Sequence, residues 1–316
     1  MPKSPLLALA LASACCFACG ADPVDVGDDD DDDDDVAGPD AAVETDLPVP
    51  ESGFQVVTPN LTIEAGQEIT YCYYTTLPPE AEVGVKKWES KMTPGSHHLI
   101  MFFLDAPGQP DGTVDTACGG GTAAPVWTYA ASEPEHDQVM PEGVGMTVAA
   151  GQPVMIQMHY LNASEEPLEA HVTLNGHTFE GDYIKAAAYV TFNTQINVPP
   201  HSAGSVTGVC DVPPGVKFFT MSTHAHHFST LAQVSDADVG TMLVETDDWE
   251  HPDVADWQDD PFFSFGSKLT YHCEYQNDTD NVVRTGDSAA TDEMCMAVGY
   301  FFPATAPVFC LDSQVF

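Results

Sequence analysis

Basic side chains are scarce in this chain. Its 316 residues include 8 lysines and arginines against 49 aspartates and glutamates, which gives a formal charge of −41 at pH 7. Nucleic acids and anionic membrane surfaces are bound through clustered cations that neutralise phosphates. The composition therefore argues against nucleic acid as a partner and against electrostatic docking on an anionic membrane.

Long apolar runs are also missing, apart from one near the N-terminus. The run "PLLALALASACC" follows Lys3 and is too short to cross a membrane. Such a pattern is typical of an export signal. The segment "SACCFACGAD" resembles the cleavage box of bacterial lipoproteins, with Cys19 as the lipidated first residue of the mature chain. We expect a signal peptide at residues 1–19 and a lipid anchor on the outer membrane or cell surface of a bacterium. The alternative is a periplasmic or secreted protein without the lipid.

A run of eight aspartates, Asp28 to Asp35, follows the signal. Like charges at this density repel one another and have no apolar surface to bury. We predict that residues 20–52 form a disordered acidic linker that acts as a solvated spacer. Calcium capture by the aspartates is the minor alternative.

Six cysteines remain once the three in the signal region are set aside. An even number in an exported chain indicates three disulfides, and six cysteines allow 15 pairings. If two domains meet near residue 185, the first two cysteines must pair, and three options remain for the other four. The six are Cys72, Cys118, Cys210, Cys273, Cys295 and Cys310.

The rest of the chain contains no convincing amphipathic helix. Short runs of apolar, aromatic and β-branched residues alternate with Gly, Pro, Asn and Asp, which is typical of strands and turns. Many strands at a spacing of about 8–12 residues favour β-sandwiches or jelly rolls. We therefore predict an all-β protein with two jelly-roll sandwich domains, at residues 53–184 and 185–316. The clearest runs are "EITYCYYTTL", "HHLIMFFL", "PVMIQMHYLN", "VKFFTMSTHAHH" and "MCMAVGYFF".

Three histidines are crowded into "STHAHHFS". Residues two apart on a strand face the same side, so His224 and His226 project together, about 6–7 Å apart. His227 points the other way. The two side chains are spaced so that both could bind one metal ion. Two histidines on an exposed strand face would explain the same pattern equally well.

The first predicted domain holds a second group of histidines. His97 and His98 are adjacent in "GSHHLIMF", and His159 lies in "QMHYLN". Adjacent histidines on a regular strand diverge, so joint use on one ion requires a bulge there. Three neutral imidazoles suit copper, zinc, iron and nickel.

Met294 and Met296 stand on a predicted strand in "TDEMCMAVGYFFP". A methionine usually fills a core. A thioether is also a soft ligand that selects copper, especially Cu(I), over zinc. The histidine pair needs a third ligand, and Met294 is the candidate for it.

These motifs together resemble the copper type II, ascorbate-dependent monooxygenases, the family of the peptidylglycine α-hydroxylating and dopamine β-monooxygenases. The similarity runs over residues 53–316. It rests on the order and spacing of the pieces "SHHLIMF", "PEGVGM", "IQMHY", "THAHH", "LTYHCEYQN", "VRTG", "DEMC" and "YFFP".

The resemblance implies two jelly-roll domains with one copper ion each. It implies hydroxylation of a substrate C–H bond with O2 and ascorbate or a similar one-electron reductant, with electrons crossing a solvent-filled cleft. It gives the metal ions, and no side-chain acid or base, the catalytic role. The implied ligands are His97, His98 and His159 for an electron-transfer copper, and His224, His226 and Met294 for an oxygen-binding copper. The implied disulfides are Cys72–Cys118, Cys210–Cys310 and Cys273–Cys295.

Three departures from the family pattern bear on the substrate. Where the peptide-amidating members carry an Arg, an Asn and a Tyr that grip a peptide carboxylate, this chain has Ser222, Met296 and Val298. None of these can make a charged or bidentate contact with a carboxylate. A neutral or cationic, partly hydrophobic small molecule therefore fits better than a glycine-extended peptide. The oligomeric state is left open.

Two other functions compete with this interpretation. A copper-binding lipoprotein without turnover would keep the fold, but it would not need two chemically different sites. A zinc hydrolase would leave Met294 unexplained, and the sequence has no H-E-x-x-H pattern.

Overall fold

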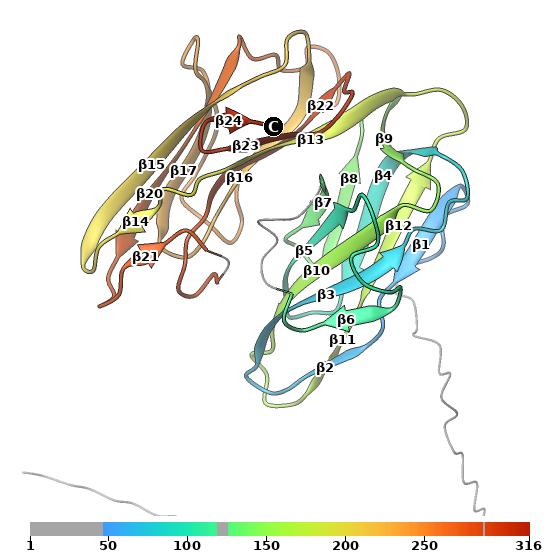
Figure 1. Ribbon diagram of the computed structural model, residues 1–316, viewed down its shortest axis with the longest axis horizontal. Helices are drawn as coiled ribbons and strands as arrows, with labels where there is room; N and C mark the ends of the chain where they lie inside the picture. The colour runs from blue at the N-terminus through green and yellow to red at the C-terminus, as the bar shows by residue number, and fades with distance from the viewer. Residues whose placement is uncertain (1–46, 119–125, 287) are drawn as a thin grey trace, which may run out of the picture. The chain divides into compact units, whose positions relative to one another are not determined.

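The computed structural model describes residues 47–118, 126–286 and 288–316 (Figure 1). The expected signal peptide, with Cys19, and residues 20–46 of the expected linker lie outside the described residues. Within the described part of the chain, no helix is long and apolar enough to span a membrane.

All regular elements in the described residues are strands, which confirms the expected all-β fold. The strands before residue 180 are β1 (Gly53–Val57), β2 (Leu61–Ile63), β3 (Glu68–Thr76), β4 (Val83–Met92), β5 (Ser96–Phe103), β6 (Thr113–Asp115), β7 (Val126–Ala131), β8 (Glu135–Val139), β9 (Val144–Val148), β10 (Pro153–Leu161), β11 (Leu168–Ala170) and β12 (Val172–Thr178).

The later strands begin with β13, whose first residue lies beside the domain boundary predicted near residue 185. They are β13 (Ile184–Phe192), β14 (Asn197–Val198), β15 (Ser202–Asp211), β16 (Lys217–Ala225), β17 (Ser229–Asp236), β18 (Met242–Thr246), β19 (Val254–Asp256), β20 (Lys268–Asn277), β21 (Val283–Arg284), β22 (Cys295–Phe302), β23 (Val308–Leu311) and β24 (Gln314–Val315). Burial alternates along strands such as β15, β16 and β20, whereas β10, β12 and β22 are buried almost continuously.

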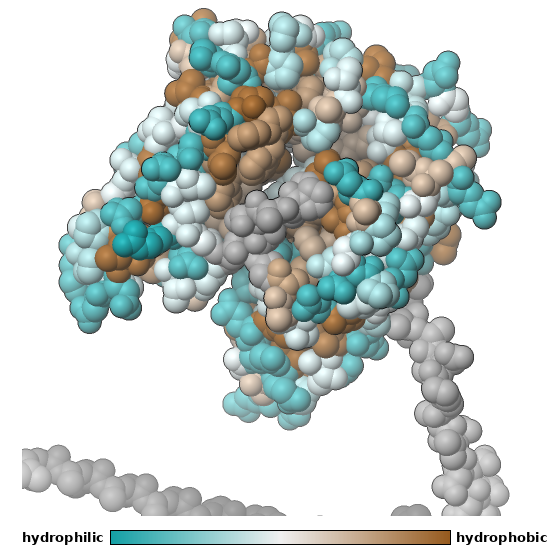
Figure 2. Space-filling view, in the orientation of Figure 1, coloured by the Kyte–Doolittle hydropathy of each residue, from teal (hydrophilic) through white to brown (hydrophobic). Residues whose placement is uncertain are grey.

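One sheet links the strands of both halves. Its path runs β1-β12-β4-β9-β13-β22-β16-β19, with β13 pairing parallel to β9 on one side and antiparallel to β22 on the other. A second sheet, β6-β3-β10-β5-β7, belongs to the first half of the chain. A third, β15-β20-β17-β18, belongs to the second half. Hydrophilic residues occupy much of the periphery of the face shown in Figure 2, and apolar residues are visible nearer its middle.

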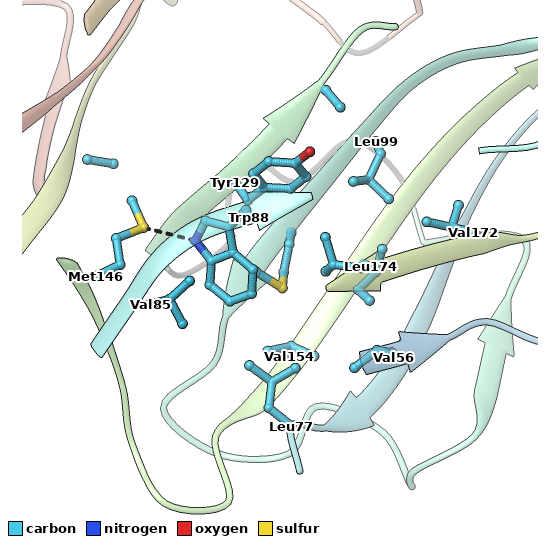
Figure 3. Close-up of a cluster of buried hydrophobic side chains, with 14 of the residues drawn as sticks. Val56, Leu77, Val85, Trp88, Leu99, Tyr129, Met146, Val154, Val172 and Leu174 are labelled. Carbon is cyan, nitrogen blue, oxygen red and sulfur yellow. Dashed lines mark hydrogen bonds between the residues drawn. The ribbon is translucent and has the colours of Figure 1, made fainter. Parts of the chain in front are cut away.

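The first half is built around a core centred on Trp88, which is fully buried (Figure 3). Its indole N–H points at the sulfur of Met146, 3.4 Å away, and its ring packs against Tyr129. Tyr300 and Phe302 of β22 belong to this same core. The second half has its own core, which includes Met221, Ala297 and Phe301.

Strands β16 and β22 separate the two cores. Their register places Ser222 opposite Val298 and His224 opposite Met296, and directly opposed residues share a face. Met296 packs into the first core, whereas Ala297, next to it in sequence, packs into the second. One face of this strand pair therefore carries a row of residues that the sequence analysis singled out.

Three disulfides are present, and they join the pairs that the resemblance implied. They are Cys72–Cys118, Cys210–Cys310 and Cys273–Cys295. The last of these ties β20 to the first residue of β22, directly after Met294.

In each half, a buried asparagine stabilises the turn at the end of a strand. Asn162 follows β10, and Asn277 ends β20. Each side-chain N–H2 lies within hydrogen-bond distance of three backbone carbonyl oxygens, and each side-chain oxygen accepts bonds from the Ser or Thr two residues later. The same pattern of asparagine hydrogen bonds thus stabilises a turn in both halves of the chain.

Candidate metal centres

His97, His98 and His159 converge at one end of the second sheet. His98 and His159 are directly opposite each other on the antiparallel pair β5 and β10. The register slips immediately after this pair, so that His97 is an extra residue without a partner in β10. This irregularity is the bulge that adjacent histidines require, and it lets both rings turn to the same side. Each of the three side chains offers a ligand atom within 4.8 Å of the others.

The hydrogen bonds of this trio leave one nitrogen of each ring facing the others. Nδ1 of His97 lies 3.2 Å from Nδ1 of His98. Nε2 of His159 lies 2.8 Å from the Glu68 carboxylate, which leaves its Nδ1 for a metal ion. A carboxylate on the outer nitrogen of a ligating histidine orients the ring and raises its basicity. Glu68 is thus a supporting residue that the sequence motifs did not indicate.

Burial keeps two of these imidazoles, His97 and His98, uncharged. It lowers the pKa of His97 and lowers that of His98 well below its usual range, and the neighbouring His159 acts in the same direction. A histidine must be neutral to donate its lone pair to a metal. The trio therefore fits a metal ion of the kind that imidazole prefers.

The second group lies where β16 ends. The rings of His224 and His226 are perpendicular, with centroids 5.4 Å apart. Nδ1 of His226 lies 3.1 Å from the carbonyl oxygen of Asp292, which leaves Nε2 for a metal ion. His224 is opposite Met296, and Met294 lies just before β22, next to the Ala225–Cys295 pair that ends the register of β16 and β22. Met294 is half-buried and packs against the first core.

Glu293 joins the segment of His226 to that of Met294. Its carboxylate is fully buried and accepts hydrogen bonds from the backbone N–H groups of His226 (2.9 Å), Phe228 (2.7 Å) and Met294 (3.1 Å). Burial raises the pKa of Glu293 to about 7, although these N–H donors act in the opposite direction. The side chain thus fixes the spacing between two candidate ligands that are far apart in sequence. Glu293 is the first residue of the E-M-C motif, but the sequence analysis gave a ligand role only to the methionine of that motif.

The second pair is also neutral. Burial, together with the neighbouring His226 and His97, lowers the pKa of His224 to about 3. Burial lowers the pKa of His226 to about 4, partly offset by its bond to Asp292. Both rings are therefore available to a metal ion well below neutral pH.

The two histidine groups adjoin each other. The ring centroids of His98 and His224 are 6.3 Å apart, and Trp249 stacks on His97 at 5.4 Å. His98 and His224 line one cavity of about 740 Å³, together with Ser222 and Val298. The two groups thus line the same cavity.

Nδ1 of His227 lies 2.5 Å from the carbonyl oxygen of Ala289, and its ring lies 6.3 Å from that of Trp249. His136 and His251, for which no role was expected, line the same cavity as His98 and His224. Asp248, Glu250 and His251 also bring ligand atoms within 4.8 Å of one another, but all three are exposed, and His251 is hydrogen-bonded to Asp248.

Residues 185–315 match a family model described as "Copper type II ascorbate-dependent monooxygenase, C-terminal domain". The C-terminal half is therefore similar to the copper type II ascorbate-dependent monooxygenases. The matched residues include His224, His226 and Met294 but stop short of the first histidine group. This match supports the monooxygenase family and a copper cofactor for the chain. No curated protein matches it.

Solved structures give only distant likenesses. The major capsid protein P2 from bacteriophage PM2 shares 9% identity over 78% of this chain and 97% of its own, with a TM-score of 0.30. The VP2 subviral particle of infectious bursal disease virus shares 10% identity over 82% of this chain and 74% of its own, with a TM-score of 0.19. Scores this low do not bear on fold or function.

Proposed function

We propose that the chain is an exported copper monooxygenase that hydroxylates a substrate C–H bond with O2 and a reductant such as ascorbate. The observation that carries this proposal is the presence of two adjoining groups of histidine side chains, both at the positions that the motifs singled out. One of these groups lies within the segment that resembles the monooxygenases.

Two ligand sets would hold two copper ions. They are His97, His98 and His159 on β5 and β10, and His224, His226 and Met294 on β16 and before β22. When bound, copper supplies one-electron redox chemistry and activates O2 for attack on a C–H bond. The thioether of Met294 favours Cu(I), whereas three imidazoles accept both oxidation states. Two chemically different sets suit a division between electron supply and oxygen binding.

The protein's own contribution is to hold these ligands neutral and in place. Burial keeps the four rings His97, His98, His224 and His226 free of protons at neutral pH. Glu68 orients His159, and Glu293 fixes the segment of His226 against that of Met294. With ring centroids 6.3 Å apart, His98 and His224 would give electrons a short path between the two sets.

The cavity beside His98 and His224 is the proposed substrate site. Its lining includes the carboxylates of Glu133, Asp137 and Asp256 and contains no lysine or arginine among the described residues. Ser222 and Val298 lie on the wall nearest His224. A carboxylate-bearing peptide has no cation to bind here, so we expect a neutral or cationic, partly hydrophobic molecule.

The test is ascorbate-dependent O2 consumption by the copper-loaded full chain, with ¹⁸O2 to trace oxygen into product. We expect about two copper ions per chain and one labelled oxygen atom per product molecule. Copper bound without turnover over a broad neutral and cationic substrate panel would favour a binding protein. Two zinc and no copper after copper loading would revive the zinc hydrolase. Efficient hydroxylation of a glycine-extended peptide would contradict the proposed substrate preference.

The two-domain division at residue 185 and the lipid anchor at Cys19 are also proposals. Three disulfides support an oxidising, extracytoplasmic location. In a bacterial host, Cys19→Ala is expected to move the chain from the membrane fraction to the soluble fraction. An unchanged distribution would contradict lipidation at Cys19.

A further inference from the structure

His97 is the member of the first histidine group that strand pairing holds least. His98 and His159 face each other across β5 and β10, and Glu68 is bonded to the outer nitrogen of His159. His97 is the extra residue of the bulge and has no partner in β10. Among the described residues, its ring has one hydrogen-bond neighbour, His98, and that contact joins the nitrogens that would face a metal ion. Another contact must therefore orient this ring.

Trp249 provides such a contact from the second half of the chain. It lies between β18 and β19 and is half-buried. Its ring stacks on that of His97, with centroids 5.4 Å apart and planes inclined by 29°. On another side it meets the ring of His227 at 6.3 Å, and His227 directly follows the candidate ligand His226. Trp249 thus touches a candidate ligand of one set and the segment that carries a candidate ligand of the other.

The loop that carries Trp249 is held in shape by Asp248. The carboxylate of Asp248 accepts hydrogen bonds from the backbone N–H groups of Glu250 (3.0 Å) and His251 (3.2 Å). The backbone N–H of Asp248 donates in turn to Oγ1 of Thr246, the last residue of β18. These bonds form a turn around Trp249 and tie it to the end of a strand, so the position of the indole is restricted before it meets His97.

Packing in a hydrophobic core does not explain the position of Trp249. The other three tryptophans, Trp88, Trp127 and Trp257, all belong to or pack against the hydrophobic clusters. Trp249 belongs to none of the clusters formed by the described residues. Its ring contacts are imidazoles instead. An aromatic ring placed in this way acts on the histidines rather than on the stability of a core.

We propose that Trp249 is a positioning residue for His97, through which the second half of the chain completes the first metal set. Stacking holds the plane of the His97 ring so that its Nδ1 stays beside Nδ1 of His98. Glu68 does the same for His159 with a hydrogen bond. The importance of Trp249 for turnover rests on the proposed monooxygenase function. Its effect on metal binding does not, because that effect needs only the metal ion.

The first test is titration with Cu²⁺ of the full chain carrying His224→Ala and His226→Ala, which leaves only the first set to bind. Adding Trp249→Ala is expected to weaken Cu²⁺ binding about three- to tenfold. Adding Trp249→Phe should keep the affinity within about twofold, because a phenyl ring can still stack on His97. An unchanged affinity in Trp249→Ala, an equal loss in Trp249→Phe, or no Cu²⁺ binding before either change would overturn the proposal.

Tryptophan fluorescence of the otherwise unaltered full chain gives a second test. Cu²⁺ quenches indole emission at short range, so Cu²⁺ bound at the first set should quench Trp249 strongly. Trp249→Phe is expected to remove most of the quenching while Cu²⁺ still binds. Trp257→Phe is the matched control and should leave quenching and affinity unchanged, because Trp257 stacks on Phe263 at 5.3 Å and packs against the second core. Full quenching in Trp249→Phe would overturn the proposal, and this result decides the matter if Trp249→Ala fails to fold.

The two proposals fail separately. Weaker Cu²⁺ binding in Trp249→Ala, without O2 consumption by the unaltered chain, would keep the positioning role and remove the enzyme. Turnover by the unaltered chain, with unchanged Cu²⁺ affinity and quenching in the Trp249 variants, would keep the monooxygenase and remove the positioning role.

Discussion

The two histidine groups are held together by different parts of the structure. In the first, all three rings project from neighbouring strands of one sheet, and a bulge at His97 aligns them. Its supporting carboxylate, Glu68, is 46% exposed. In the second, His226 lies beyond the end of β16 and Met294 before the start of β22, and the fully buried Glu293 fixes both.

This difference separates two ways of building a metal site. A sheet positions ligands by register, so a site of that kind is as stable as the strand pairing that carries it. A site beyond the ends of strands needs an additional stabilising residue. The backbone there makes no interstrand hydrogen bonds, so its N–H groups require other acceptors. We therefore expect the first group to tolerate loss of its supporting carboxylate better than the second.

Loss of the thioether is the largest expected effect. Met294→Ile removes the soft ligand while keeping apolar volume, so hydroxylation should fall more than 100-fold, and bound copper should fall from about two ions to about one. Copper content and O2 consumption are the measurements. Met242→Ile is the control, since Met242 is 45% exposed. Surviving activity would mean that Met294 is not a ligand and would direct attention to Met296.

Part of each histidine group was predictable, because strand periodicity can be read from the local sequence. Strand geometry alone puts His224 and His226 on the same face and requires a bulge at His97 and His98. Strand β4, in the middle of the large sheet, was not among the expected strands. Its sequence "VGVKKWESKM" carries four charged residues, although every second residue from Trp88 to Met92 is buried.

The adjoining position of His98 and His224 could not be predicted, because it depends on how β13 links the two halves through β9 and β22. The role of Glu293 was hidden for a similar reason. A buried carboxylate that accepts N–H groups from residues more than 60 positions away leaves no periodic signal in the sequence.

The Glu293 anchor gives the second prediction. Glu293→Ala leaves the N–H groups of His226 and Met294 without their acceptor, so copper affinity at the second set should fall about 10–100-fold while the first set is unaffected. Glu68→Ala is the matched comparison at the first set, with a loss of less than about tenfold. X-ray absorption should show a weaker copper–sulfur signal in Glu293→Ala only. Equal losses of copper affinity in the two variants would contradict a greater dependence of the second ligand set on its supporting carboxylate.

The third prediction concerns the two turns that Asn162 and Asn277 stabilise, one in each half of the chain. Asn162→Ala and Asn277→Ala each remove a buried amide that satisfies three carbonyl oxygens, so each should lower the free energy of unfolding by about 2 kcal/mol. Denaturant unfolding is the measurement. Asn60→Ala is the control, since Asn60 is exposed and has no such turn. A loss confined to one of the two buried positions would show that the turns are not equivalent.

The smallest expected effect concerns acid stability in the first half. Hydrogen bonds from Asn175, and then from His177 and Lys87, lower the pKa of Glu89 to about 2, against the opposing effect of burial. A carboxyl group with a lowered folded-state pKa stabilises the fold above its unfolded pKa of about 4.5, and this stability is lost as pH falls towards 2.

Glu89→Gln should therefore cost about 1 kcal/mol at pH 7 and nothing near pH 2, so that the difference from wild type narrows through this window. Unfolding measured in urea between pH 2 and pH 7 tests this. Glu274→Gln in the second half is the control, because Glu274 is exposed and lies on β20. A constant difference across the pH range would mean that Glu89 acts through packing rather than through its charge.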